Sequence, residues 1–328
     1  MPNSNNLTKR LFLTGNLKPF IEAVILHTKQ INENLFLVDL QTGGFRNLIA
    51  SYLIKGKQTI IVETGPTSSI PNLILALKET NVKPEDVSYV ALSHIHVDHG
   101  GGVGTLLKTL PNAKVIVHPR GAPNLINPDR LWVQTLQTLG NVAEIFGVPE
   151  PVSQDRIVIA ADGMKFDVGA GIKLIAIETL GHAAHHLSYH LPIYSGIFPG
   201  DAAGIYLREF EAVIPTSPPP FRLDIALASL ENLIAFKPKL LYYTHFGEAS
   251  DAVERLRRYA QQLKHWMNIV KDGLGKDQSP SIIRERILAE DVNMRKMVNF
   301  LRSHPIYSKT AIGNSVQGFL DFAGKTRS

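Results

Sequence analysis

Short apolar runs separated by turns organise the first 245 residues of the chain. These runs are rich in β-branched and aromatic residues and are bounded by Gly, Asn or Lys-Gly, which is typical of β-strands. The predicted strands are residues 36–40, 47–54, 58–64, 87–94, 114–119, 195–201 and 239–245, with several more, joined by glycine-containing turns, inside residues 156–182. Apolar residues at helical spacing predict helices over residues 68–81, with Ser69 as the N-cap, and over residues 223–236.

The pattern becomes helical after residue 247. Residues 250–275 have the pattern of one long helix, and residues 279–290 and 291–304 predict two more helices, the first of which opens with Ser-Pro. Two domains are therefore predicted, an α/β domain over residues 1–249 and a C-terminal helical extension over residues 250–328.

The composition is that of a globular protein with a large core, since 44% of the 328 residues are hydrophobic and 19% are charged. No apolar run reaches the length of a transmembrane helix, and the N-terminal stretch lacks the long apolar core of a secretory signal. We therefore expect a cytoplasmic protein with no membrane partner. The chain has no cysteine, so any metal must be held by His, Asp or Glu.

The net charge of +5 is spread along the chain. Its densest basic cluster, Arg255, Arg257 and Arg258, lies among acidic residues on a predicted helix, which is typical of a solvated helix face. A nucleic-acid partner would need a basic stripe with aromatic residues for stacking, and none is evident. The expected partners are instead a small-molecule substrate and, for the helical extension, a second copy in a homodimer.

Ligand-type side chains follow four of the predicted strands. The segment LSHIHVDHGGGV, residues 92–103, places three histidines and an aspartate directly after an apolar strand, and three further strands close on ETLGH, IFPGD and YYTH. Strand ends converge on one edge of a layered α/β fold, so these side chains can meet in one pocket. Two zinc-like ions side by side need about six or seven ligands. The chain offers seven: His94, His96, Asp98, His99, His182, Asp201 and His245.

These motifs resemble those of a known family. HIHVDH resembles the HxHxDH signature of the metallo-β-lactamase superfamily, and VETGP (62–66), LGHAAHH (180–186), FPGD and YYTHFGE resemble its other motifs in the same order. The similarity covers about residues 35–250. The resemblance implies a four-layer αββα sandwich, two β-sheets packed face to face between helices, with the metals at one edge and the helical extension after it.

The resemblance also implies roles for the seven residues. His94, His96 and His182 would hold one metal ion, Asp98, His99 and His245 would hold the second, and Asp201 would bridge them. The two divalent ions are expected to be zinc, with iron and manganese as alternatives. The predicted function is a binuclear metal-dependent hydrolase that cleaves a thioester, lactone or phosphoester with a hydroxide between the ions, which Asp98 and Asp201 orient as the catalytic carboxylates.

Two other functions stay open. One is a mononuclear iron oxygenase resembling the persulfide dioxygenases of the same superfamily, which iron content and oxygen uptake would distinguish. The other is a non-catalytic ligand-binding protein that has kept the fold, which turnover of any ester would exclude. The helical extension is expected either to cap the active-site edge and shape substrate choice, or to be a structural or dimerising appendage.

Several residues near the motifs have two interpretations. Glu63 stands where the family usually has Asp, and we expect it to support the metal ligands from behind without binding the metal. His186 either supports a ligand or stabilises a turn, whereas His185 and His190 are expected to be ordinary histidines. Tyr206 either donates a hydrogen bond to substrate or packs as an aromatic ring. The proline-rich loop over residues 215–221 is expected to be a connector.

Overall fold

The computed structural model describes residues 27–326, and its first sheet has seven strands in sequence order. They are β1 (Thr28–Asn32), β2 (Leu35–Asp39), β3 (Ala50–Lys55), β4 (Thr59–Val62), β5 (Val87–Ala91), β6 (Lys114–Val117) and β7 (Ile157–Ile159). Neighbours from β1 to β4 pair antiparallel, and those from β4 to β7 pair parallel. The carboxyl ends of β4 to β7 therefore lie at one edge.

The second sheet has six strands and one parallel pair, β11 with β14. In spatial order they are β15 (Gly247–Ala249), β14 (Leu240–Tyr243), β11 (Gly196–Phe198), β10 (Leu187–Leu191), β9 (Lys173–Glu178) and β8 (Lys165–Asp167). A separate hairpin is formed by β12 (Ile205–Leu207) and β13 (Ala212–Ile214).

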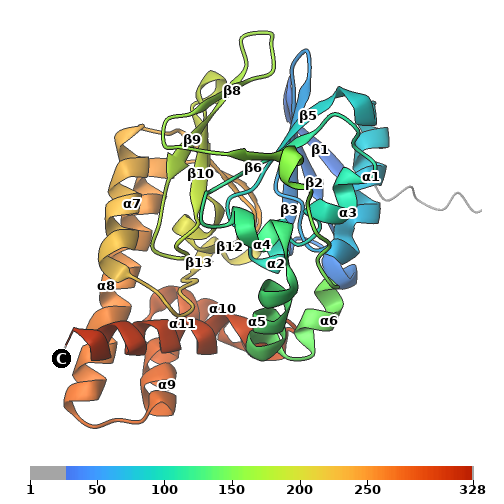
Figure 1. Ribbon diagram of the computed structural model, residues 1–328. Coiled ribbons are helices and arrows are strands. Elements are labelled where there is room, and N and C mark those ends of the chain that lie inside the picture. The colour runs from blue at the N-terminus through green and yellow to red at the C-terminus, as the bar shows by residue number, and fades with distance from the viewer. Residues whose placement is uncertain (1–26, 327–328) are drawn as a thin grey trace, which may run out of the picture.

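Helices cover the outer faces of both sheets, with α1 and α3 beside the first sheet and α7 beside the second (Figure 1). The helices are α1 (Ile70–Glu79), α2 (Val97–Gly100), α3 (Val103–Leu107), α4 (Ala122–Ile126), α5 (Asp129–Leu139), α6 (Val142–Phe146), α7 (Leu223–Ala235), α8 (Ala252–Gly275), α9 (Pro280–Glu290), α10 (Val292–Ser303) and α11 (Tyr307–Lys325). Within residues 27–326, no helix is both long and apolar enough to cross a membrane.

Successive side chains of the strands point to opposite faces of each sheet and build two hydrophobic layers. In β4, Ile60 and Val62 lie in the core between the sheets, whereas Ile61 lies in the cluster beneath the helices. This is the expected result of side chains that point to opposite faces at successive positions of a strand. The Tyr52 hydroxyl donates to the Tyr243 carbonyl oxygen at 2.7 Å and joins the two sheets across that core. The predicted αββα sandwich is confirmed.

The C-terminal helices share a hydrophobic cluster with the sandwich. That cluster joins Ile214 of the hairpin to Leu256 and Trp266 of α8 and to Phe319 of α11. In Figure 1, α10 and α11 lie across the lower edge of the sandwich, the same edge as α2, and α9 lies below them. The division of the chain into two domains stays a prediction.

The predicted helices and strands occur near their expected positions, but one cap was wrong. Ser69 precedes α1 without capping it, because its hydroxyl pairs with the Thr42 hydroxyl at 2.7 Å. Ser279 does cap α9, accepting from the Ile282 N–H at 3.4 Å. The sequence pattern missed several elements, among them β1, β15, the β12–β13 hairpin, the short helices between β5 and β7, and α11.

Candidate metal centre

The seven ligand-type residues meet where strands of the two sheets end. His94 and His96 follow β5, and Asp98 and His99 lie on the short helix α2. The other three come from the second sheet: His182 follows β9, Asp201 follows β11 and His245 follows β14. Because the sheets pack face to face, residues up to 151 positions apart in the chain come together at one edge (94 to 245).

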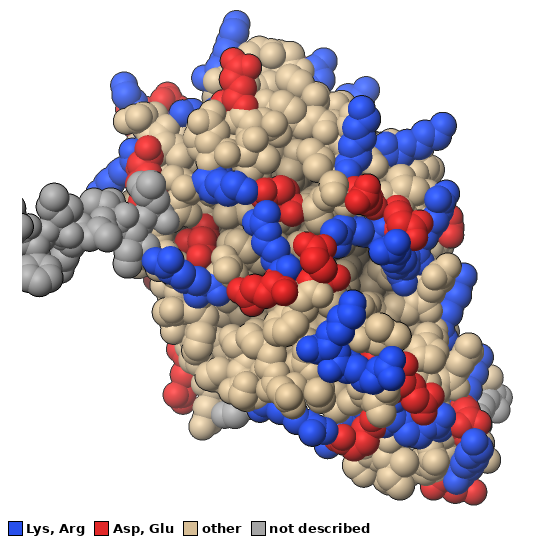
Figure 2. All heavy atoms as spheres, turned by 180° about the vertical axis from the view of Figure 1, so that it is seen from behind, with Lys and Arg blue, Asp and Glu red and all other residues tan. Residues whose placement is uncertain are grey.

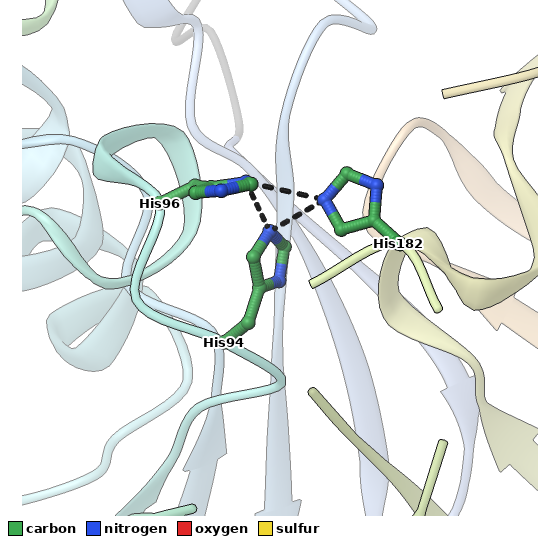
Figure 3. A group of neighbouring side chains, drawn as sticks. All are labelled: His94, His96 and His182. Carbon is green, nitrogen blue, oxygen red and sulfur yellow. Dashed lines mark hydrogen bonds between the residues drawn. The ribbon is translucent and has the colours of Figure 1, made fainter. Parts of the chain in front are cut away.

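Three imidazoles form the first group (Figure 3). His94 Nε2 lies 2.9 Å from His96 Nδ1, and His182 Nε2 lies 3.2 Å and 3.1 Å from those two atoms. His182 Nδ1 donates to the Thr216 carbonyl oxygen at 2.9 Å, so its Nε2 presents a lone pair to the other two rings. Three ring nitrogens point to one place, and at least one of them presents a lone pair. This arrangement suits a bound cation better than hydrogen bonds among the three rings.

The second group combines carboxylates and imidazoles. Asp98 Oδ2 lies 4.0 Å from His99 Nε2 and 3.7 Å from His245 Nε2, and the two ring nitrogens are 3.3 Å apart. His245 Nδ1 donates to the Leu48 carbonyl oxygen at 2.8 Å, so its Nε2 also carries a lone pair. The second group therefore presents mainly acceptor atoms to one point, which again suits a cation.

Asp201 faces both groups. Its Oδ2 lies 3.5 Å from His182 Nε2 in the first group, and its Oδ1 lies 3.3 Å from His99 Nε2 and 3.8 Å from His245 Nε2 in the second. One oxygen is thus directed to each group, which is the arrangement that a bridging carboxylate requires. The side chain is buried, so its charge is poorly screened by water.

The electrostatics of the two groups differ. Burial and the neighbouring imidazoles of His99 and His96 hold the pKa of His94 well below its usual range, so its ring is neutral. Burial would also lower the pKa of His99, but the carboxylates of Asp201 and Asp98 outweigh it and raise that pKa well above its usual range. Burial would raise the pKa of Asp201, yet the imidazoles of His99 and His182 hold it well below normal. A proton on His99 thus balances the carboxylates where a cation could do so instead.

Glu63 supports this second group from behind. Its Oε1 accepts the Ser93 N–H at 2.8 Å, and its Oε2 lies 3.3 Å from His99 Nδ1. All three residues are buried, and Glu63 has a left-handed backbone with φ 66°. The carboxylate therefore fixes the ring of His99 with Nε2 toward Asp98 and Asp201, as the sequence predicted for this position.

His186 holds the loop that carries Asp201. The Asp201 N–H donates to His186 Nε2 at 3.1 Å, so Nδ1 carries the ring proton and donates to the Thr179 hydroxyl at 2.9 Å. Thr179 then donates to Ser188 Oγ at 2.8 Å, and Ser188 donates to the Pro199 carbonyl at 3.0 Å. His186, Thr179 and Ser188 each accept one hydrogen bond and donate one, so the direction of every bond in this buried series is fixed. His186 thus stabilises the turn that carries Asp201, which is one of the proposed metal ligands.

Three other features that the sequence singled out have different surroundings. The Tyr206 hydroxyl donates to Glu211 Oε1 at 2.8 Å and its ring lies 5.0 Å from the Arg255 guanidinium, so it packs away from the seven ligand-type residues. His185, expected to be an ordinary histidine, has its ring 5.6 Å from that of His96, and burial and His182 lower its pKa to about 4. The proline-rich loop is more than a connector, because its Thr216 carbonyl orients His182.

Comparison with known proteins is consistent with this arrangement. The sequence model described as "Metallo-beta-lactamase superfamily" matches residues 45–245. A metallo-beta-lactamase fold-containing protein of Sulfurisphaera tokodaii, ST1585, is 28% identical over 258 residues, which cover 76% of this chain and 91% of that protein.

Solved structures show the same fold. The crystal structure of ST1585 superposes with a TM-score of 0.61 over 70% of this chain and 85% of that one. A metallo-beta-lactamase family protein of Thermus thermophilus, TTHA1429, is 20% identical and gives a TM-score of 0.60 over 85% of this chain and 89% of its own. The second match extends further along the present chain, and at its level of identity it shows the fold alone.

Proposed function

Since this chain belongs to the metallo-β-lactamase superfamily, we propose that it is a metal-dependent hydrolase that binds two divalent ions and cleaves a small ester-like bond. The observation that supports this most directly is the placement of Asp201, which directs one carboxylate oxygen to each of two groups of ligand-type atoms. A single-ion site would not need that second group.

Each proposed ion would have a complete set of protein ligands. His94, His96 and His182 would hold the first, Asp98, His99 and His245 the second, and Asp201 both. The ring nitrogens of His182 and His245 that face the two groups already carry lone pairs, because their other nitrogens donate to main-chain carbonyls. These two rings can therefore bind a cation without rotating. Zinc suits this mixture of imidazole and carboxylate ligands, and iron and manganese are alternatives.

When bound, two divalent ions supply the Lewis acidity that makes water a nucleophile at neutral pH. Asp98 is proposed to orient the attacking water and accept its proton, because 29% of its side chain is exposed, whereas Asp201 is buried. Water adds to the carbonyl carbon or phosphorus, the bond to the leaving oxygen or sulfur breaks, and the leaving group takes up a proton. The thioesters, lactones and phosphoesters all fit this reaction.

Metal analysis joined to a substrate panel tests the proposal. The purified chain should bind about two zinc ions and hydrolyse at least one of a p-nitrophenyl ester, a thioester, a lactone and bis(p-nitrophenyl) phosphate. Asp98→Ala removes one carboxylate of the second group, so it should retain about one ion and lose roughly a hundredfold or more in kcat. Asp321→Ala, which removes an α11 carboxylate paired with Gln317, should match the parent.

Two other results would each favour a different function. A single iron per chain, with metal and activity retained in Asp98→Ala, would contradict the two-ion hydrolase and favour the oxygenase. A parent loaded with two ions that turns over none of the four substrates would favour a ligand-binding protein.

A further inference from the structure

The C-terminal helices reach the edge of the sandwich where the metal centre lies. Helix α11 packs on α5, and α5 packs on α2, the helix that carries Asp98 and His99. Figure 1 shows α10 and α11 running along this edge, with α11 beginning beside α5. The first residue of α11 is Tyr307. The helical layer therefore brings the start of α11 to the side of the molecule that holds the proposed site.

The Tyr307 side chain is fixed in place. Only 4% of its surface is exposed, and its ring lies 4.7 Å from that of His304 and 6.0 Å from that of Phe300. Its N–H donates to His304 Nδ1 at 3.3 Å, which ties the start of α11 to the end of α10. The ring can neither turn freely nor move out to solvent.

The hydroxyl of this tyrosine has no hydrogen-bond partner among the described residues. Buried hydroxyl groups in folded proteins are nearly always paired, because water is lost without replacement when they are not. Tyr206, the tyrosine that the sequence had suggested as a substrate donor, differs in this respect, because its hydroxyl is already bonded to Glu211. A buried donor that is left unpaired is available to a ligand, although the hydroxyls of Tyr242 and Tyr243 are unpaired within residues 27–326 as well.

The packing of α11 on α5 and of α5 on α2 directs that ligand to the metal centre, and the charges around Tyr307 agree with it. Burial raises the pKa of Tyr307, and the carboxylates of Asp98 and then Asp201 raise it further, so both lie within electrostatic reach of the hydroxyl. These are the two proposed catalytic carboxylates of the centre. The hydroxyl therefore keeps its proton at neutral pH and can donate a hydrogen bond.

We propose that Tyr307 is a catalytic residue contributed by the helical extension, and that its hydroxyl donates a hydrogen bond to an oxygen of the ester or phosphoester group undergoing hydrolysis. This inference rests on the proposed function and deepens it. It gives the extension a direct part in the site, since an oxygen that gains negative charge during the reaction is stabilised by a fixed, desolvated donor. The favoured substrates have such an oxygen in a carbonyl, thioester or phosphoryl group.

Tyr307→Phe tests the inference because it removes the hydroxyl and keeps the ring against His304 and Phe300. With zinc-loaded protein and p-nitrophenyl acetate or bis(p-nitrophenyl) phosphate, kcat/KM should fall about a hundredfold. Zinc content and melting temperature should stay at the parent values. Tyr206→Phe is the matched control, since it also removes one tyrosine hydroxyl, and its kcat/KM should lie within about twofold of the parent.

A binding measurement separates this inference from the proposed function. Inorganic phosphate carries oxygens of the expected kind, and calorimetry on the zinc-loaded protein should give about tenfold weaker binding for Tyr307→Phe and unchanged binding for Tyr206→Phe. A parent that hydrolyses no probe would contradict the proposed function, while phosphate affinity would still decide the role of Tyr307. Equal affinity in Tyr307→Phe and the parent, or no binding to the parent, overturns the inference.

Discussion

His186 shows how one buried side chain can position a residue that is proposed to bind metal. It accepts the Asp201 N–H and donates to Thr179. His186→Ala should leave the Asp201 N–H buried without an acceptor, remove the donor to Thr179 and free the loop that carries Asp201. Since residues that orient metal ligands typically contribute 10–100-fold in metal affinity, we expect zinc to bind about 10–100-fold more weakly. Chelator competition measures this directly.

His190→Ala is the matched control for that experiment. His190 lies four positions further along the chain, half-buried in β10, where its ring packs on Phe236 at 5.0 Å. Its removal also deletes an imidazole, but it leaves the Asp201 loop intact. Equal zinc affinities for the two variants would show that His186 does not hold Asp201 in a metal-binding position.

At the scale of single residues, the sequence predicted the ligand-type residues far better than the groups that orient them. His, Asp and Gly at strand ends form a recognisable pattern, and the structure brings all seven predicted residues together. Their orientation depends largely on main-chain atoms: His182 donates to the carbonyl of Thr216 and His245 to that of Leu48. Any residue type can offer a carbonyl oxygen, so no sequence pattern marks these positions. Glu63 was predictable because its support comes from a side chain.

At the scale of elements, the junction between α9 and α10 depends on one carboxylate. Asp291 Oδ1 accepts the N–H groups of Asn293 and Met294 and so caps α10, while its Oδ2 accepts from Trp266 Nε1 at 2.7 Å and Gln262 Nε2 at 2.8 Å of α8. Asp291→Ala removes the cap and leaves buried donors unpaired. The free energy of unfolding should fall by about 3 kcal/mol or more.

Urea unfolding of Asp291→Ala should be compared with that of Ser279→Ala. Ser279 caps α9 with a single long hydrogen bond at 3.4 Å to the Ile282 N–H, in an exposed position. Its loss should cost about 0.5–1 kcal/mol. Similar losses in the two variants would mean that the bonds from Asp291 to α8 add little to its role as a cap.

Helix α11 was missed because its sequence is a poor helix former, with Gly313, Gly318 and Gly324 among several Ser and Thr residues. Packing explains the second glycine. A Cβ at position 318 would clash with the main-chain oxygen of Ser217, whereas one at position 313 would meet nothing within 4 Å. Glycine at position 318 lowers the helix propensity of the segment but allows close contact with the loop that carries Thr216. Tertiary packing therefore decides whether α11 forms.

Two alanine substitutions on α11 test this explanation. Gly318→Ala should lower the free energy of unfolding by about 1–3 kcal/mol, because the helix or the loop must move to admit the methyl group. Gly313→Ala should be neutral or stabilising by up to about 1 kcal/mol, since alanine is the better helix former and the space is open. Thermal and urea denaturation give both values. A stabilised Gly318→Ala would contradict the close packing.

At the scale of the whole molecule, most strand positions followed from apolar runs, and the layers followed from the resemblance of five motifs. The way the helical extension packs did not follow, because the residues that join it to the sandwich are ordinary apolar side chains, such as Ile214 and Leu256, whose partners no pattern specifies. The distribution of charged residues does not indicate how the extension packs either. On the face shown in Figure 2, Lys and Arg side chains lie among Asp and Glu side chains.

The shared hydrophobic cluster leads to a prediction about unfolding. Leu207 and Phe221 of the first 249 residues pack in the same cluster as Tyr259, Trp266 and Phe319 of the last 79 (250 to 328). Separating the two parts would expose apolar surface on both, at about 25 cal/mol for each Å². Neither part should therefore stay folded without the other, and urea should unfold the protein in one transition.

The two tryptophans of the chain make this prediction measurable. Trp132 lies on α5 and Trp266 is fully buried on α8, so in Trp132→Phe the fluorescence reports only on the helical extension. Hydrogen exchange of peptides from β5 reports on the first sheet at the same urea concentrations. Chains of this length often unfold through intermediates, so coincident midpoints would be informative. Gly318→Ala should shift both midpoints equally, and a shift in Trp266 fluorescence alone would show that the extension unfolds independently of the sandwich.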